Sequence, residues 1–348
     1  MNSLDAQLPS LHSNVIATPL VSVIVPCYNE QATIRLLLAA LYQQNFSRQD
    51  TEVIIADGLS TDNTRQEIEA FRSEHPDLSI SIVDNQRRTI PAGLNRAIHA
   101  ARGQYIIRLD AHSVPRADYI SRCINALEAG LGENVGGVWE IRPARSNWIA
   151  RAIAIAAAHP LGVGDAHYRF TDQAQMVDTV PFGAFRRDLV ERIGGFDETL
   201  LTNEDYEFNV RVRQGGGKIW LDPQIRSTYF ARPTFTALAQ QYWRYGFWKG
   251  RMLIRYPGTL RWRQALPPLF VSGLIVLGLL TPWLALARWT FAAVVFIYVL
   301  ALMVASIKPA VSSGDLSLLF GVPLSIAIMH VTWGTALIWS LLSYRFTK

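Results

Sequence analysis

The stretch Gln104–Ser113, QYIIRLDAHS, decides how the fold of this chain is interpreted. Its first half, Tyr105–Ile107, is rich in β-branched residues and predicts a short strand that runs into Asp110 and a turn. In an open α/β sheet, ligands bind beyond the carboxyl ends of the strands. An acid at that edge is therefore a candidate diphosphate–metal ligand, although a strand followed by an Asx-type turn would also explain this decapeptide alone.

The segments around this stretch alternate between strand and helix patterns. Leu20–Pro26 and Thr51–Ala56 are apolar runs of strand length, which is typical of strands buried on both faces of a parallel sheet. Leu78–Val83 predicts a third strand, and Pro91–Arg102 predicts a helix with Pro at its start and Gly103 after its end. The alternation predicts an α/β, doubly wound, Rossmann-like domain.

Charge is distributed unevenly along the chain. Eight Lys or Arg and no Asp or Glu lie between Arg226 and Arg263, and the sequence that follows is almost free of charge. Three uncharged segments there are each long enough to cross a hydrocarbon core of about 30 Å. They are Gln264–Ala287, Trp289–Ile307 and Leu316–Tyr344. We expect residues 264–348 to form a transmembrane anchor of about three helices, with the basic side in the cytoplasm and Lys348 outside.

The start of the chain and its cysteines indicate a cytosolic compartment for the rest. Cys27 and Cys123 show neither metal-ligand spacing nor a disulfide framework. The first twenty residues lack the basic and apolar regions of a signal peptide. We therefore expect a flexible leader at residues 1–18 and a cytosolic catalytic domain at residues 19–232.

Residues 233–263 predict a basic interfacial segment, in which Phe235–Arg255 is an amphipathic helix rich in aromatic residues. We interpret membrane lipids as its partner. Nucleic acid is not an expected partner, because no nucleic-acid-binding motif accompanies the charge.

Four stretches in this order resemble glycosyltransferase family 2, the inverting, nucleotide-sugar-dependent family with a GT-A fold. They are VSVIVPCYNE (21–30), IIADGLSTDNT (54–64), RGQYIIRLDAHS (102–113) and TNEDYEFNVRVRQGG (202–216). The resemblance covers about Val21 to Lys249 and is closest to the bacterial succinoglycan and exopolysaccharide glucosyltransferase branch. It implies a GT-A catalytic domain followed by C-terminal transmembrane helices.

The resemblance implies a nucleotide-sugar site at the strand ends. Asp57 would bind the nucleotide base, since a carboxylate accepts from a uracil N–H and an aromatic ring packs against its face. The neighbouring wall would be Pro26, Tyr28 and Glu30, and the approach to the diphosphate would carry Arg87, Arg88 and Asn95. A strand-end turn for Asp57, and solvated basic residues for the arginines, are the alternative interpretations.

Asp110 and His112 fall on the family's Asp-x-Asp motif, in which the first Asp contacts the nucleotide and the second position ligates Mn²⁺ or Mg²⁺. The resemblance therefore implies one of these cations as cofactor. Imidazole suits Mn²⁺ better than Mg²⁺, so His112 favours Mn²⁺. A structural histidine is the alternative.

Glu204 and Asp205 match the family's Glu-Asp pair, with Asp205 as the general base that deprotonates the acceptor hydroxyl. An acidic first helical turn favoured by the helix dipole is the alternative. Gly183 resembles part of the acceptor-site floor. Residues 241–245 resemble the Gln-x-x-Arg-Trp motif near the diphosphate and acceptor, which implies binding roles for Gln241, Trp243, Arg244 and Tyr245.

The resemblance implies a multi-pass hexosyltransferase of the bacterial inner (plasma) membrane with its catalytic domain in the cytoplasm. The expected donor is UDP-glucose, and the expected acceptor is a polyprenyl-diphosphate-linked saccharide in exopolysaccharide biosynthesis. A processive polysaccharide synthase is one alternative. A catalytically idle nucleotide-sugar-binding or scaffold subunit is another.

Overall fold

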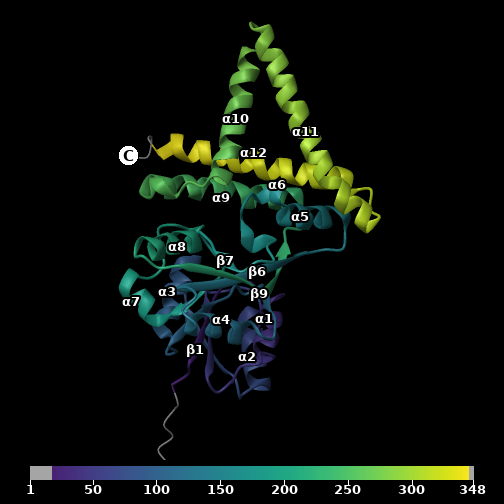
Figure 1. Cartoon of the computed structure of the whole chain (residues 1–348). Helices are drawn as coiled ribbons and strands as arrows, with labels where there is room; N and C mark the ends of the chain where they lie inside the picture. The colour runs from purple at the N-terminus through teal and green to yellow at the C-terminus, as the bar shows by residue number, and fades with distance from the viewer. Residues whose placement is uncertain (1–17, 345–348) are drawn as a thin grey trace, which may run out of the picture.

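The computed structural model describes residues 18–344, so the predicted leader lies outside the described residues except for its last position. Those residues form a nine-stranded mixed sheet flanked by helices, with a layer of long helices on one side of it (Figure 1). The strand order is β3-β2-β1-β4-β8-β6-β9-β5, and β7 pairs with β9. This arrangement confirms the predicted α/β class.

The first half of the sheet is parallel. Its strands are β1 (Val21–Cys27), β2 (Thr51–Asp57), β3 (Ser79–Asp84) and β4 (Tyr105–Arg108), and its helices are α1 (Ile34–Tyr42), α2 (Thr64–Glu74) and α3 (Ile90–Ala100). Every residue of β2 and β4 is buried, as the apolar runs predict. The carboxyl ends of these strands therefore meet at one edge of the sheet.

The second half of the sheet mixes directions. Its strands are β5 (Val114–Pro115), β6 (Asn134–Pro143), β7 (Gln175–Met176), β8 (Ala184–Arg186) and β9 (Ile219–Ala231), with helices α4 (Tyr119–Glu128), α7 (Arg187–Ile193) and α8 (Glu204–Gln214). β8 runs antiparallel to both β4 and β6. The Arg108 N–H donates to the Gly183 carbonyl at 3.0 Å, so the turn before β8 lies beside the end of β4.

A helical layer covers one side of the sheet domain and joins it to the C-terminal helices. It contains α5 (Trp148–Ala158), α6 (Pro160–Val163), α9 (Phe235–Arg255) and α12 (Leu318–Tyr344). α9 has the bounds predicted for the amphipathic helix and lies along α12 (Figure 1). Gly246 and Gly250 make this approach possible, because a Cβ on Gly246 would lie 2.4 Å from the Trp333 carbonyl oxygen.

Helix α5 is encoded inside the predicted catalytic segment but also packs on α12. A Cβ on Gly321 of α12 would lie 2.6 Å from Cβ of Ala152, and Arg151 forms an ion pair with Asp315 at 2.7 Å. The helical layer is thus built from two regions far apart in the sequence.

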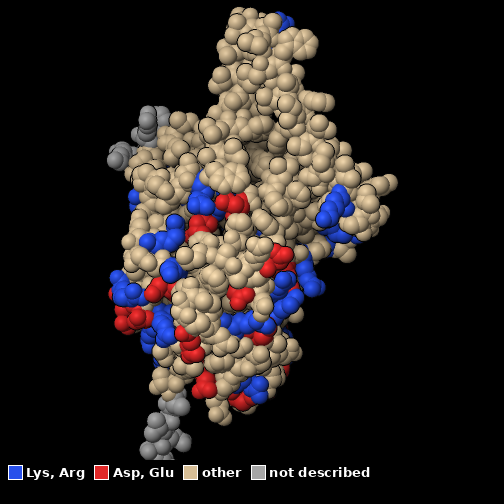
Figure 2. Space-filling view, in the orientation of Figure 1, with Lys and Arg blue, Asp and Glu red and all other residues tan. Residues whose placement is uncertain are grey.

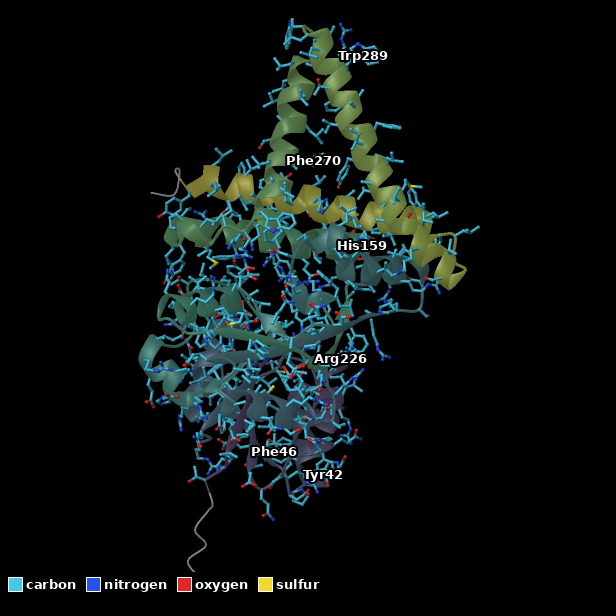
Figure 3. The ribbon with its side chains drawn as sticks, viewed as in Figure 1. Tyr42, Phe46, His159, Arg226, Phe270 and Trp289 are labelled. Atoms are coloured by element: carbon cyan, nitrogen blue, oxygen red, sulfur yellow. The ribbon has the colours of Figure 1, made fainter. Side chains whose placement is uncertain are left out.

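Helices α10 (Trp262–Leu280) and α11 (Ala285–Ser313) form a hairpin that projects from this layer (Figure 1). Trp289 lies near its tip and Phe270 nearer its base (Figure 3). Figure 2 shows charged side chains over the sheet domain and almost none on the hairpin. Three helices, α10, α11 and α12, are long and apolar enough to cross a membrane, within residues 18–344.

Candidate active site

The centre of the candidate active site is Arg108, a cation at the end of strand β4 that is only 2 % exposed. Its guanidinium lies 3.1 Å from a carboxylate oxygen of Asp110 and 2.9 Å from one of Glu204, and it pairs with Asp205 as well. One arginine therefore holds three carboxylates together. Fully buried charges require such partners.

The backbone around Asp205 is held in unusual conformations. Asn203, which precedes α8, and Phe182, in the turn before β8, both have positive φ values, of 69° and 66°. Such angles are uncommon for residues other than glycine, and they cluster at functional sites. The Phe182 N–H points to the Asp205 carboxylate, at 3.4 Å from Oδ2. The turn and the start of α8 together fix where Asp205 lies.

The ionisation of Asp205 suits proton transfer. Burial raises its pKa, the positive charge of Arg108 opposes this, and the negative charges of Glu204 and Asp110 add to it, with a resulting pKa of about 7. A carboxyl group that titrates near neutral pH can take up a proton and release it again, as a general base must. The role of general base that the resemblance implies for Asp205 stays a prediction.

Asp110 and His112 lie at the same edge of the sheet. His112 Nδ1 is 3.0 Å from Glu30 Oε1, which ties the end of β4 to the end of β1. Burial alone would lower the pKa of His112, but the hydrogen bond with Glu30 and the charge of Asp110 raise it.

Asp110 and His112 are the donors that a shared metal site at this edge would use, and metal binding there stays a prediction. No group of three or more His, Cys, Asp or Glu that could hold a metal occurs among residues 18–344. A cation bound to a nucleotide diphosphate needs only one or two protein ligands, because phosphate and water oxygens supply the rest. One carboxylate from Asp110 and one imidazole from His112 meet that requirement.

A cavity of about 630 Å³ opens on the carboxylates. Arg108, Asp110 and Asp205 line one part of it, and its lining continues to residues of the C-terminal helices. These are Leu266, Pro267 and Phe270 of α10, Tyr298 of α11, and Met329, His330 and Trp333 of α12. Phe270 lies in the lower part of the hairpin (Figure 3) and packs on Tyr298, with ring centroids 4.4 Å apart. The cavity therefore connects the acidic centre with the apolar helices.

The cavity brings together about half of the residues that the sequence singled out. Those that line it are Asp110, His112, Glu204, Asp205, Gln241, Arg244 and Tyr245. Those outside its lining, within the part of the chain that the structure describes, are Pro26, Tyr28, Glu30, Asp57, Arg87, Asn95, Gly183 and Trp243.

Asp57 lies at the end of β2, beside Cys27 of β1, as the predicted base-binding residue should. Its carboxylate is fully buried, however, and already accepts hydrogen bonds from the backbone and hydroxyl of Ser60, at 3.0 and 2.5 Å, and from Arg65 at 2.6 Å. Tyr28, 44 % exposed, lies beside Gly58. Base binding at this edge stays a prediction.

Arg87 and Asn95 both contact Glu198. Arg87 forms an ion pair with it, and the Asn95 amide donates to it at 2.9 Å and to the Phe196 carbonyl at 2.9 Å. These contacts hold the segment before α8 against α3. A diphosphate contact for either residue remains a prediction.

The residues of the predicted Gln-x-x-Arg-Trp-like motif point in different directions. Gln241 is buried and donates to the hydroxyls of Tyr229 and Tyr245, at 2.9 Å each. Arg244 and Tyr245 line the cavity, whereas Trp243 is 40 % exposed and lines a separate pocket beside Thr332. The motif thus contributes an amide, a cation and a phenol to the cavity lining, whereas Trp243 lies outside it.

Two arginines of this site were missed by sequence reasoning. Arg108 could have been noticed, because a single cation inside an otherwise apolar buried strand needs a partner. Arg169 lies in a short 3₁₀ helix, His167–Arg169, in a region with no hydrophobic period or motif, so nothing in the sequence marked it.

Comparisons with known proteins show which family the chain resembles. The family described as "Glycosyl transferase family 2" matches residues 22–194. The chain is 25 % identical over 335 residues to the Methanococcus voltae protein named "Dolichyl N-acetyl-alpha-D-glucosaminyl phosphate 3-beta-D-2,3-diacetamido-2,3-dideoxy-beta-D-glucuronosyltransferase", covering 94 % of this chain and 96 % of that relative. It is 27 % identical over 327 residues to "Succinoglycan biosynthesis protein ExoA" of Rhizobium meliloti, covering 93 % and 95 %.

Among solved structures, the chain is similar to the mannosyltransferase PcManGT from Pyrobaculum calidifontis, in a complex with GDP-Man and Mn²⁺. The TM-score is 0.59 at 22 % identity, over 95 % of this chain and 88 % of that one, which shows a shared fold. The family match, the two relatives and the acidic centre lead to one conclusion: this chain belongs to glycosyltransferase family 2 and is a glycosyltransferase.

Proposed function

We propose that this glycosyltransferase moves a sugar, with inversion, from a nucleotide-sugar donor to a polyprenyl-diphosphate-linked saccharide during exopolysaccharide assembly. The observation that carries the proposal is the cavity that runs from Asp205 to the apolar helices α10, α11 and α12. A saccharide on a lipid needs polar groups at its reacting end and an apolar path for its tail. UDP-glucose is the first donor to test, because the family resemblance of the sequence motifs implies it.

In this proposal Asp205 takes the proton of the acceptor hydroxyl as that oxygen attacks the anomeric carbon. Arg108 orients the carboxylate and, through Glu204 and Asp110, holds the surrounding charges in place. Arg244 lines the same cavity and offers a planar donor fork to the leaving diphosphate.

Asp110 and His112 would hold a divalent cation, and the imidazole favours Mn²⁺ over Mg²⁺. When bound, such a cation supplies positive charge to the departing diphosphate.

We also propose a membrane arrangement that differs from the three crossings expected from composition. In the most apolar windows of α10 and α11, 17 % and 11 % of residues are buried in the protein, against 39 % in α12, which packs on α9 and α5. The hairpin would cross the inner membrane. α12 would lie at its cytoplasmic face, so both the catalytic domain and the end of α12 would be cytoplasmic.

The test is sugar transfer in membranes that contain the full chain or its Asp205→Asn variant. UDP-glucose, UDP-galactose and GDP-mannose are compared by nucleotide release, with and without lipid extract. We expect lipid-dependent release with UDP-glucose, and a fall in transfer of about 10²–10⁴-fold in Asp205→Asn with donor binding retained. Asp188→Asn, which removes an exposed acid on α7, is the matched control. Near wild-type transfer by Asp205→Asn would overturn the assignment of the base.

A further inference from the structure

Arg169 is a buried cation without an acidic partner among residues 18–344. It is 7 % exposed, and its one hydrogen bond within residues 18–344 runs from Nη1 to the Ala157 carbonyl, at 3.2 Å. The buried arginines Arg108 and Arg263 each pair with at least two carboxylates. No ion pair of the described residues includes Arg169. A guanidinium has five N–H donors, so Arg169 keeps donor capacity for a ligand.

The surroundings of Arg169 are aromatic. Its guanidinium carbon lies 5.0 Å from the ring centroid of Trp139 and 5.4 Å from that of Tyr168, within the range of cation–π contacts. These rings hold the side chain in place without neutralising it. Burying a charge in such surroundings is costly unless a counter-charge arrives.

Arg169 lines the same cavity as Asp205, together with Arg232 and Arg244. Neither of these two arginines forms an ion pair with an acid in residues 18–344. Arg169 thus lies in the lining of the cavity without a carboxylate partner, whereas Glu204 and Asp110 are held by Arg108. A single diphosphate, that of the donor, already has Asp110, His112 and Arg244 as its candidate contacts.

The segment that carries Arg169 is attached to the membrane helices. Its first part, α6, accepts a hydrogen bond from α12, where His330 Nε2 lies 3.0 Å from the Leu161 carbonyl oxygen. The adjacent lining is apolar, with Phe270 and Met329 among its residues. An anion that reaches Arg169 beside these helices can carry an apolar tail.

We propose that Arg169 binds the phosphate of the lipid-linked acceptor, with the isoprenoid chain leaving the cavity between α10, α11 and α12. This inference rests on the proposed function, and it adds that Arg169 is the residue that recognises the acceptor. Arg169 is thus a binding residue for an isoprenyl diphosphate, and the sugar to be extended lies on the side of Asp205.

The test measures binding, which requires no sugar transfer. The full chain in phosphatidylcholine nanodiscs is titrated with farnesyl diphosphate, farnesol and UDP. We expect farnesyl diphosphate to bind more tightly than farnesol. Arg169→Gln should weaken farnesyl diphosphate binding by about 10- to 100-fold and leave UDP affinity unchanged, since a hydrogen-bonded charge contact is lost. Arg142→Gln, which removes an exposed cation of β6, should leave both affinities unchanged.

Several results would overturn the assignment. One is equal binding of farnesyl diphosphate and farnesol, and another is wild-type farnesyl diphosphate affinity in Arg169→Gln. A loss of UDP affinity in a variant that unfolds at the wild-type temperature would assign Arg169 to the donor. If phosphatidylglycerol nanodiscs competed with farnesyl diphosphate for binding, Arg169 would be assigned to membrane headgroups.

Arg169→Lys separates binding from structure. It keeps the charge and should lose less affinity than Arg169→Gln, whereas equal losses with equally lowered unfolding temperatures would make Arg169 structural. A chain that binds farnesyl diphosphate through Arg169 yet transfers no sugar to lipid would overturn the proposed function and leave this inference standing.

Discussion

Replacing Arg108 by Met removes the one cation that three carboxylates share. The pair between Arg108 and Glu204, at 2.9 Å, and the pair with Asp110, at 3.1 Å, are lost together with the pair to Asp205. Breaking a buried ion pair by removing one partner costs about 3–5 kcal/mol of stability. The remaining negative charges then repel one another, so the loss should be greatest where all three are ionised.

The change should also move the titration of Asp205. Arg108 lowers the pKa of Asp205, whose value with the arginine present is about 7. An adjacent arginine lowers a carboxyl pKa by about 1–3 units, so its removal should raise the pKa of Asp205 by a similar amount. A base works only when ionised, and kcat/KM therefore falls as pH drops through this pKa. The acid limb of the profile should move to higher pH in Arg108→Met.

The pH dependence of folding stability follows from the same increase in the pKa of Asp205. A carboxyl group whose pKa is raised by folding binds more protons in the folded state, so its contribution to stability falls as pH rises. Arg108→Met should thus be closest to the wild type in stability at low pH and furthest from it above neutral pH.

The assay is kcat/KM against pH at saturating Mn²⁺, with thermal unfolding measured across the same range. Arg48→Met removes the cation of an exposed ion pair with Asp77, at 2.7 Å, and should change neither profile. Arg108→Lys, which retains the charge, should fall between the wild type and Arg108→Met. An unmoved acid limb in a folded Arg108→Met variant would refute the role of Arg108 in setting the ionisation of the base.

Four further predictions follow from the geometry. Asp57→Asn should weaken UDP binding before it slows transfer; a lowered unfolding temperature with unchanged UDP affinity would instead make Asp57 structural. His112→Ala should abolish Mn²⁺ stimulation while His112→Asp accepts Mg²⁺ more readily, and an unchanged metal response in both would remove His112 from the site. Gly246→Val should lower the unfolding free energy by about 1–3 kcal/mol through a clash with α12, which denaturant titration in detergent can measure against Gly258→Ala, a site open to a side chain. A reporter fused after Lys348 should be cytoplasmic, and an external reporter would support three crossings.

The parallel half of the sheet was predictable because its signal is local. The buried runs of β1 and β2 were placed within a residue of their observed bounds, since a strand covered on both faces must be apolar throughout. β8 has three residues, and it is a strand only because β4 and β6 lie on either side of it. No pattern within the three residues of β8 predicts that they pair with β4 and β6.

The residues of the candidate site also differ in whether a local sequence pattern identifies them. Asp110 and Asp205 were singled out because their motifs are contiguous in sequence. The surroundings of Arg108 and Arg169 also depend on distant residues, which are Glu204 and Asp205 for Arg108 and Trp139 for Arg169. The apolar length of α12 was evident, but composition does not say whether an apolar surface meets lipid or protein. Its contact with α9 depends on two glycines whose spacing matters only once the partner is known.

The packing of α5 against α12 bears on how this enzyme could be recombined with its relatives. A crossover placed after β9, where the sheet ends, would give the catalytic part a foreign anchor. In such a chimera Ala152 of α5 would lose its contact with Gly321 of α12. Gly246 and Gly250 of α9 would lose the helix that packs against them. Exchange should succeed only when residues 148–163 travel with the C-terminal helices, so the inherited unit is discontinuous in the gene.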